Sequence, residues 1–181
     1  MPSDPLAWET IESDTVYECD GFAVRQDTVT LPSGQETEFD YVHEPPGVII
    51  LPFTPDGDVI AIEEWRQAVG RINRGLPAGS SEPDDPDIES TARRELLEET
   101  GHQAGEIEPL CVFEPANGPT DFVNHYFVAT DCEPAGDQSL DLDESIRVTR
   151  VPYEELLTAA TEGDLRDGRS ALGILYYELG T

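Results

Sequence analysis

The chain has 181 residues, enough for one domain with a hydrophobic core and at most a small additional subdomain. Its formal net charge is −29, because 39 acidic residues face ten arginines and no lysine. A surface this acidic repels nucleic acids and anionic membranes, so the composition argues against both as partners.

The cellular setting follows from the same composition. The acidic excess predicts an intracellular protein of a halophile, since concentrated salt screens the repulsion among these charges. The first ten residues, MPSDPLAWET, have neither the basic region nor the apolar stretch of a signal peptide. No apolar run reaches the roughly 18–20 residues that cross a bilayer. The three cysteines, Cys19, Cys111 and Cys132, are widely spaced and predicted to be reduced, so we expect a cytoplasmic protein.

The N-terminal part of the chain is predicted to form strands. Residues 1–14 are polar and contain proline, which predicts loose packing. Residues 16–42 alternate apolar and polar side chains around a Ser-Gly turn, as antiparallel strands do. Such a small set of strands has little core of its own and must pack on another part of the chain or on another chain. The Pro-Pro-Gly sequence at 45–47 therefore separates a strand subdomain, 1–44, from a main domain, 45–181.

The main domain begins with a continuous apolar run. Residues 48–51 read Val-Ile-Ile-Leu, which predicts a strand buried on both faces. An Asp56-Gly57 turn leads into a second strand at 59–65. The further predicted elements are an extended piece at 75–79, a helix at 87–100, strands at 110–113, 122–130 and 146–151, and helices at 153–161 and 170–179. This order predicts an α/β fold in which helices cover a mixed sheet.

The predicted helix at 87–100 carries a cluster of glutamates. Glu95, Glu98 and Glu99 have the i, i+3, i+4 spacing that places them on one helix face. Like charges at this spacing destabilise an isolated helix by a few tenths of a kcal/mol per pair. Arg94 lies one turn before Glu98 and can pair with it. Because Mg²⁺ prefers carboxylate oxygens, the cluster predicts a Mg²⁺ site, with an ordinary solvated helix face as the alternative.

Gly79 together with the segment 94–101, RELLEETG, resembles the Nudix box, G-x5-E-x7-R-E-U-x-E-E-x-G-U, in which U is apolar. The resemblance implies an α/β/α sandwich that hydrolyses nucleoside diphosphates linked to another group. It also implies Mg²⁺ as the cofactor, with Mn²⁺ as a substitute. The metal ligands implied are Glu95 and Glu99, with Glu98 nearby and the Ala78 carbonyl as a further ligand; Glu98 and Arg94 are implied as catalytic residues, and Ala78 and Gly79 as part of the substrate site.

The sequence departs from this box at two places. The interval from Gly79 to Arg94 is one residue longer than the pattern, so Pro86 stands where the box has its first glutamate. Asp85 or Asp84 can replace that glutamate if the loop bulges. At the last apolar position stands His102, which we interpret as a polar cap of the helix end rather than a metal ligand, since Mg²⁺ avoids imidazole.

Features outside the box resemble the ADP-ribose pyrophosphatase branch of the family, over about residues 16–180. In that branch an N-terminal strand subdomain builds a dimer, which implies a homodimer here. Residues 62–66 resemble a strand that ends in an arginine near the ligand, and guanidinium binds phosphate through two hydrogen bonds. This implies substrate contacts by Arg66 and Trp65; a surface ion pair is the alternative for Arg66. Gly75 stands where the branch usually has glutamate, so the resemblance specifies the reaction better than the substrate.

Residues 141–148 resemble an acidic loop that carries a further metal-binding glutamate. The resemblance assigns this role to Glu144, and in some members of the family this glutamate is also the general base. Asp143 and Asp141 are further candidates for activating water, and a solvated loop is the alternative. An EF-hand is excluded, because Leu142 replaces the glycine that such a loop requires. The aromatic side chains of Trp65, Phe39 and Tyr41 are candidates for stacking on adenine, with core packing as the alternative.

Together these features predict an enzyme that hydrolyses ADP-ribose to AMP and ribose 5-phosphate. The alternatives are another substrate, namely a GDP-sugar, NADH, a dinucleoside polyphosphate or a modified dNTP, or a nucleotide sensor without catalysis. A sensor would be expected to lose the box carboxylates, and this chain keeps three of them, Glu95, Glu98 and Glu99. A simple metal buffer would need neither the Arg94-Glu95 pair nor the Leu-Pro-Ala-Gly sequence.

Overall fold

The computed structural model describes residues 4–180, which form two compact units. The smaller one, here called the strand unit, runs to Pro46 and includes Glu114–Val123. The larger one, here called the main unit, comprises Gly47–Phe113 and the chain from Asn124 onward. The division of the chain into domains at 44/45 stays a prediction, and it did not anticipate that the distant segment Glu114–Val123 joins the strand unit.

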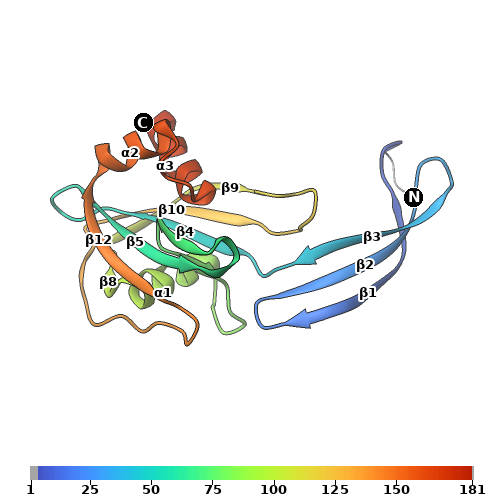
Figure 1. Ribbon diagram of the computed structural model, residues 1–181, viewed down its shortest axis with the longest axis horizontal. Coiled ribbons are helices and arrows are strands. Elements are labelled where there is room, and N and C mark those ends of the chain that lie inside the picture. Colours follow the sequence, from blue (N-terminus) through green and yellow to red (C-terminus); the bar gives the residue numbers. More distant parts are fainter. Residues whose placement is uncertain (1–3, 181) are drawn as a thin grey trace. The chain divides into compact units, whose positions relative to one another are not determined.

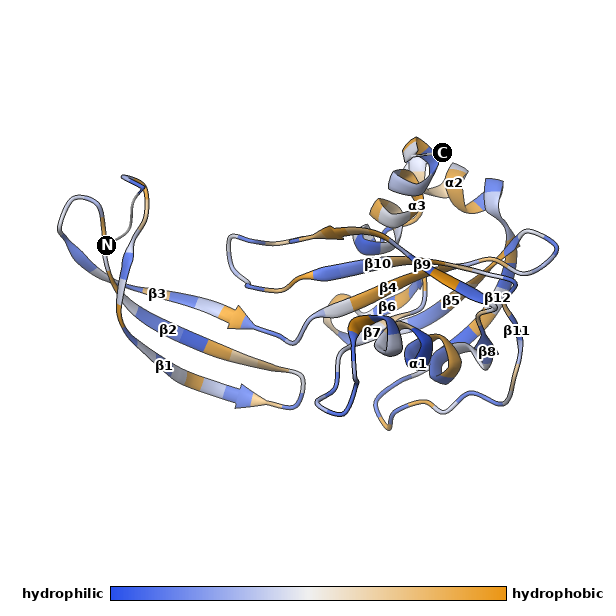
Figure 2. Ribbon diagram, turned by 180° about the vertical axis from the view of Figure 1, so that it is seen from behind, coloured by the Kyte–Doolittle hydropathy of each residue, from blue (hydrophilic) through white to orange (hydrophobic). Residues whose placement is uncertain are grey.

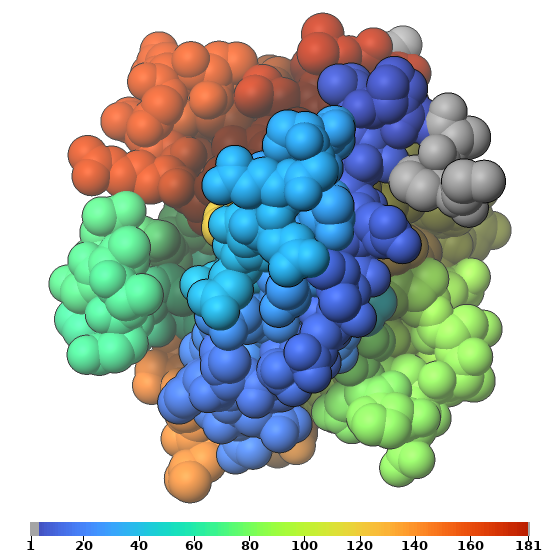
Figure 3. All heavy atoms as spheres, turned by 90° about the vertical axis from the view of Figure 1, so that its right-hand side faces the viewer, coloured from blue at the N-terminus to red at the C-terminus, as the bar shows by residue number. Residues whose placement is uncertain are grey.

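The strand unit is a single antiparallel sheet. Its strands β1 (Glu9–Cys19), β2 (Phe22–Thr30) and β3 (Glu36–His43) lie in that order. Gly21, which turns β1 into β2, has a φ of +99°, a conformation that glycine adopts without strain. The strands, in shades of blue in Figure 3, lie side by side. Val29 is buried and most other side chains of these strands are exposed, so the sheet has the small core that its size predicts.

The N-terminal strand begins earlier than predicted. Strands were expected from residue 16, but Glu9–Cys19 forms β1 and its residues pair with β2 from Thr30 to Phe22. Backbone hydrogen bonds hold this strand, and these do not require apolar side chains. The side chains from Glu9 to Glu18 are exposed, in keeping with the loose packing expected of residues 9–14. Residues 1–3 lie outside the described residues.

Two sheets form the centre of the main unit (Figure 1). Their strands are β4 (Gly47–Pro52), β5 (Asp58–Arg66), β6 (Arg71–Gly75), β7 (Ala78–Ser80), β9 (Glu106–Phe113), β10 (Asn124–Thr130) and β12 (Ile146–Pro152). One sheet has the order β7-β4-β10-β9 and is parallel only between β4 and β10. The other has the order β12-β5-β6 and is antiparallel. A short pair, β8 (His102–Gln103) with β11 (Glu133–Pro134), and a 3-10 turn at Gln67–Val69 complete the strands and turns.

Helices lie on both sides of these sheets. Helix α1 (Ile88–Thr100) is on one side, and α2 (Tyr153–Glu162) and α3 (Gly168–Gly180) are on the other, as Figures 1 and 2 show from opposite directions. The predicted α/β/α arrangement is therefore confirmed, and each predicted helix is present.

Strand β4 connects the two halves of the core. All six of its residues are buried, as the apolar run predicted. Because side chains alternate along a strand, Ile49 and Leu51 pack in the cluster that contains Ile174 of α3, whereas Ile50 packs in the cluster that contains Leu96 of α1. Fully burying such a side chain stabilises the fold by about 1.5–3 kcal/mol. Helix α1 is thereby fixed against the sheet through apolar side chains such as Leu96.

The ends of α1 are those that the sequence predicted. The Asp87 side chain accepts a hydrogen bond from the Ser90 N–H at 2.8 Å and caps the first turn. Gly101 ends the helix with a φ of +69°. His102 follows, with its Nδ1 2.8 Å from the Thr100 carbonyl oxygen, in keeping with a polar cap. Both ends of the glutamate helix are thus fixed by local interactions.

Among the described helices, none has the length and the apolar character needed to cross a membrane.

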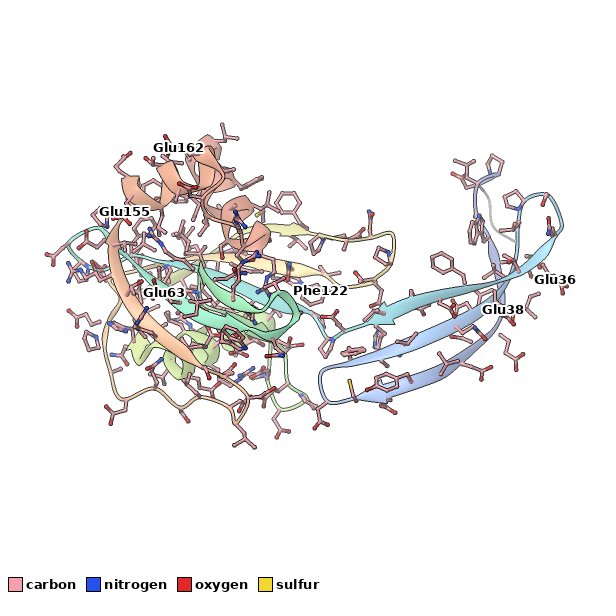
Figure 4. All side chains as sticks on the ribbon, viewed as in Figure 1. Glu36, Glu38, Glu63, Phe122, Glu155 and Glu162 are labelled. Atoms are coloured by element: carbon pink, nitrogen blue, oxygen red, sulfur yellow. The ribbon has the colours of Figure 1, made fainter. Side chains whose placement is uncertain are left out.

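The acidic surface leads to a prediction about salt. Glu36 and Glu38 on β3, and Glu162 on α2, are exposed and project from the ribbon (Figure 4). We expect the melting temperature to rise from low to molar KCl, since counter-ions screen the repulsion among such carboxylates. Replacing all three by glutamine should reduce the rise. A melting temperature that is independent of KCl would contradict the halophilic interpretation.

Candidate active site

Two of the three helix glutamates are buried. Glu95 is 8% exposed and Glu99 is 2% exposed, on the edge of α1 that meets the sheet. The Glu98 side chain, from the neighbouring position on the helix, is 38% exposed. The i, i+4 pair therefore lies in the protein interior, and Glu98 lies at its rim.

Glu99 is held by the strand that precedes the helix in the sequence. The Ala78 N–H of β7 donates a hydrogen bond of 2.9 Å to Glu99 Oε2. Burial raises the pKa of Glu99 to about 9, although the Ala78 N–H opposes this shift. A buried carboxylate with one neutral donor is poorly compensated when it is charged, so a cation beside it would be strongly favoured.

Glu95 lies directly against Gly79. A Cβ atom added to Gly79 would be 2.0 Å from Glu95 Cδ, so the backbone of β7 passes over the carboxylate with no room for a side chain. Burial raises the pKa of Glu95 to about 7, and the charge of Arg94 opposes the shift. The Leu-Pro-Ala-Gly sequence and the glutamate helix thus meet at two buried carboxylates.

Arg94 connects the helix to the loop before it. Its Nη1 donates to Glu95 Oε1 and to Glu98 Oε2, each at 2.9 Å, so the predicted pair with Glu98 is present. Its Nη2 donates to the Ser80 carbonyl oxygen at 2.9 Å and lies 3.0 Å from Asp85 Oδ2. Of the two aspartates left open as replacements for the missing glutamate, the structure brings Asp85 to the arginine.

The acidic loop contributes Glu144 to the same region. Glu144 Oε2 accepts a hydrogen bond from the Asp141 N–H at 3.0 Å, which fixes the loop. The charge of Glu144 contributes to the raised pKa values of Glu95 and Glu99, so it acts on both carboxylates. Asp143 is exposed, and the structure does not bring it to this group.

Strand β5 ends with the two residues expected to contact substrate. Arg66 Nη2 lies 2.7 Å from Glu64 Oε2, so Arg66 makes an ion pair within its own strand. Trp65 is 46% exposed, and its Nε1 donates to Gln67 Oε1 at 2.9 Å. Core packing, the alternative to adenine stacking, does not apply to Trp65.

Glu64, which the sequence did not single out, is a further buried carboxylate that acts on Glu99. Its side chain is 10% exposed, and within the described residues its Oε2 lacks a hydrogen-bond donor because the Arg66 contact has no hydrogen-bond geometry. Burial raises the pKa of Glu64; the charge of Arg66 lowers this pKa, and the charge of Glu144 raises it further. The charge of Glu64 in turn raises the pKa of Glu99. The signal was strand alternation, since Ile60, Ile62 and Glu64 are successive side chains on one face of β5.

Two of the aromatic candidates lie in the strand unit. The rings of Phe39 and Tyr41 are stacked with their centroids 6.3 Å apart, and Trp8 meets Phe39 edge-on at 5.7 Å. These three rings pack on one another within that unit. Their role as an adenine platform stays a prediction.

The donor set fits a hard divalent cation. The buried or half-buried groups are carboxylates, and Glu64, whose Oε2 pairs with Arg66 at 2.7 Å, adds a further carboxylate that acts on Glu99. Within residues 4–180 no three acidic, histidine or cysteine side chains already converge on one point as a finished metal site. Arg94 binds both Glu95 and Glu98. A cation would therefore compete with Arg94 for Glu95 Oε1.

The raised pKa values predict how stability depends on pH. Glu95 and Glu99 hold their protons more tightly when folded, so their contribution to stability is complete below about pH 4.5 and is lost as pH rises toward about 7 and about 9, respectively. We expect the free energy of unfolding of the metal-free protein, in molar KCl, to fall between pH 5 and pH 9. Glu99→Gln should reduce that fall, whereas Glu89→Gln, an exposed change on the same helix, should not. An equal fall in both variants would contradict the burial argument.

Comparisons with known proteins agree with this geometry. A family description of the NUDIX domain matches residues 43–170. The ADP-ribose pyrophosphatase of Bacillus subtilis (strain 168) is 29% identical over 175 residues, 96% of this chain and 94% of that protein. The methanol dehydrogenase activator of Bacillus methanolicus is 27% identical over 173 residues, 94% of this chain and 92% of that protein.

The fold is found in a solved structure as well. A crystal structure of an ADP compounds hydrolase superposes with a TM-score of 0.80 at 21% identity, covering 94% of this chain and 92% of that one. The family match spans most of the chain, including the strand β7, the glutamate helix α1 and the loop with Glu144. The protein therefore belongs to the Nudix hydrolase family and is a Nudix pyrophosphohydrolase.

Proposed function

We propose that the protein hydrolyses ADP-ribose to AMP and ribose 5-phosphate in a reaction that depends on Mg²⁺, with Mn²⁺ as a substitute. The observation that carries the proposal is the pair of buried carboxylates, Glu95 and Glu99, packed against the backbone of Ala78 and Gly79. The similarity to an ADP-ribose pyrophosphatase over nearly the full length of both proteins supports the choice of substrate.

In this proposal the chain's carboxylates hold the cation. Glu95 and Glu99 are its main ligands, and Glu98, Glu144 and the Ala78 carbonyl complete the set. When bound, a divalent cation neutralises phosphate oxygens and lowers the pKa of a water molecule. Arg94 keeps Glu98 and Glu95 oriented through its Nη1.

The chain's other groups position the reactants. The oxygen of water forms a bond to one phosphorus, and the bond from that phosphorus to the bridging oxygen breaks. A carboxylate takes the proton of the water, and we assign this to Glu144, which is half-buried and acts on both ligand carboxylates, ahead of Asp143 and Glu98. Arg66 binds phosphate or ribose, with Glu64 holding its guanidinium, and exposed Trp65 provides a surface for the base.

We further propose that the strand unit mediates a homodimer. Its sheet has almost no buried side chains and carries the exposed aromatic rings of Trp8 and Phe39. An isolated sheet of this kind is stabilised by covering one face. The acidic composition supports a cytoplasm rich in salt as its location.

A substrate panel tests the proposed activity. ADP-ribose, a GDP-sugar, NADH, a dinucleoside polyphosphate and a modified dNTP are incubated in molar KCl with and without Mg²⁺, and products are separated by chromatography. The proposal predicts that ADP-ribose has the highest kcat/KM and yields AMP and ribose 5-phosphate only with the cation. Preference for another substrate would refute the substrate assignment, and binding of ADP-ribose without turnover would favour a sensor.

A further inference from the structure

The loop before α1 contains an aspartate, Asp85, that faces Arg94. Pro86, at the position where the box pattern has glutamate, cannot accept a side-chain hydrogen bond. Asp85, one residue earlier, faces Arg94 instead. Its Oδ1 accepts from Arg94 Nε at 3.2 Å and its Oδ2 accepts from Nη2 at 3.0 Å. This is the two-point contact by which a carboxylate fixes the plane of a guanidinium.

Asp85 is itself held rigidly. The Thr91 hydroxyl and the Glu82 N–H each donate to Asp85 Oδ2 at 2.9 Å. Its side chain is 11% exposed. Proline on either side of the loop, at 83 and 86, fixes one backbone torsion at each point. The acceptor that faces Arg94 is therefore part of the loop's own structure and not a mobile surface charge.

The contact with Asp85 determines which N–H groups of the Arg94 guanidinium remain for other partners. Asp85 and the Ser80 carbonyl occupy the Nε and Nη2 edge of the guanidinium. Nη1 donates to Glu95 and Glu98 at 2.9 Å each and lies 3.6 Å from Glu82 Oε1, an exposed carboxylate of the same loop. If Asp85 lost its charge, the guanidinium could turn and bind those two glutamates more completely, at the expense of a cation. The hydrogen bond from Arg94 holds the pKa of Asp85 well below its usual range, so Asp85 is charged at any working pH.

We propose that Asp85 is a positioning residue for the proposed metal site: it holds Arg94 so that Glu95 and Glu98 stay available to a divalent cation. The lengthened loop is then a local rearrangement that preserves the ion pair by moving the carboxylate one residue toward the N-terminus. The proposal rests on the proposed metal-dependent function and concerns a position, Asp85, at which the box pattern, counted back from Arg94, specifies no residue.

Asp85→Asn tests this role, with Asp84→Asn as the matched control. Both changes remove one negative charge from the loop, and Asp84 is exposed. Mn²⁺ affinity is measured by electron paramagnetic resonance in molar KCl, and kcat and KM for ADP-ribose are measured with Mg²⁺. Asp85→Asn should weaken Mn²⁺ binding and lower kcat by about 10–100-fold each, the range seen when partners of metal ligands are removed, with KM changed far less. Asp84→Asn should change each quantity by less than about twofold, as surface changes usually do.

Two further variants keep the test decisive if Asp85→Asn folds poorly. Thr91→Val removes a donor to Asp85 without changing charge and should reduce Mn²⁺ affinity in the same direction, by less. In the background of Arg94→Lys, Asp85→Asn should cause little additional loss, because a residue that acts through Arg94 has nothing left to position.

The outcomes separate this proposal from the proposed substrate. Equal effects of Asp85→Asn and Asp84→Asn, or additive losses in the Arg94→Lys background, would overturn the role of Asp85 even if ADP-ribose is hydrolysed. Absence of ADP-ribose turnover in the wild type, with Mn²⁺ binding weakened only by Asp85→Asn, would refute the substrate and support the role of Asp85.

Discussion

Glu99→Gln should abolish Mg²⁺-dependent turnover while leaving the fold intact. The amide has the shape of the carboxylate, and its oxygen can still accept the Ala78 N–H that now binds Glu99 at 2.9 Å. It cannot supply a negative charge to a cation. Since a bound metal ion contributes several kcal/mol to the stabilisation of the transition state, kcat should fall on the order of 10³-fold.

Stability separates this effect from misfolding. Burial raises the pKa of Glu99 to about 9, because ionising it in the metal-free protein is costly, and the amide avoids this cost as pH rises toward 9. The metal-free variant should therefore unfold at pH 9 no more easily than the wild type. Glu89→Gln, which breaks an exposed ion pair with Arg93 on the same helix, should keep full activity. More than a tenth of wild-type kcat in Glu99→Gln would refute its assignment as a metal ligand.

Gly79→Ala should be the second most damaging change to activity, with a small effect on folding. The new Cβ would lie 2.0 Å from Glu95 Cδ and 2.2 Å from its Oε1, so the carboxylate must move. The Glu95 side chain is flexible and can swing away at modest cost in stability. It would then leave the position beside Glu99, and kcat should fall about 10²-fold, as expected for misplaced catalytic groups.

A control glycine distinguishes the site from a general intolerance of alanine. Gly168, the first residue of α3, has open space around its Cβ position, and Gly168→Ala should keep wild-type activity. Circular dichroism should show both variants folded. Activity near wild type in Gly79→Ala would mean that the position of Glu95 is not critical.

Much of the main unit follows from its sequence. The apolar run of β4 determines the burial of that strand, and the capping residues of α1 determine where the helix begins and ends. Both effects are local, so the sequence pattern alone was sufficient to predict them. Strand β1 was not predicted over its first residues, because its pairing with β2 depends on backbone hydrogen bonds and on a partner strand. The composition of such a polar strand does not distinguish it from a loop.

At the candidate site, too, features set by neighbouring residues were predictable from the sequence, and contacts with distant segments were not. The spacing of Glu95 and Glu99 placed both carboxylates on one face of α1, but their burial depends on β7, which the spacing does not reveal. The choice between Asp84 and Asp85 likewise required the position of Arg94 in space.

Gly75 illustrates how a distant segment explains a local departure. The sequence marked it as unusual for its branch. In the structure, a Cβ atom at this position would be 2.9 Å from both Asp167 Oδ2 and Ser170 Oγ, beside the start of α3. Ser170 also accepts the Leu76 N–H at 2.8 Å. Side chains from nearly one hundred residues later occupy the space, which no reading of neighbouring residues could show.

Mn²⁺ binding by the wild type and by the Glu95→Gln/Glu99→Gln variant is the most direct test of the claim that α1 is the metal centre of this enzyme. Electron paramagnetic resonance distinguishes free from bound Mn²⁺, and molar KCl suppresses binding to the acidic surface. A matched variant, Glu89→Gln/Glu154→Gln, changes two exposed glutamates instead. We predict a tight Mn²⁺ site in the wild type and in the matched variant that is lost when Glu95 and Glu99 are replaced. Equal Mn²⁺ affinity in all three proteins would contradict the claim.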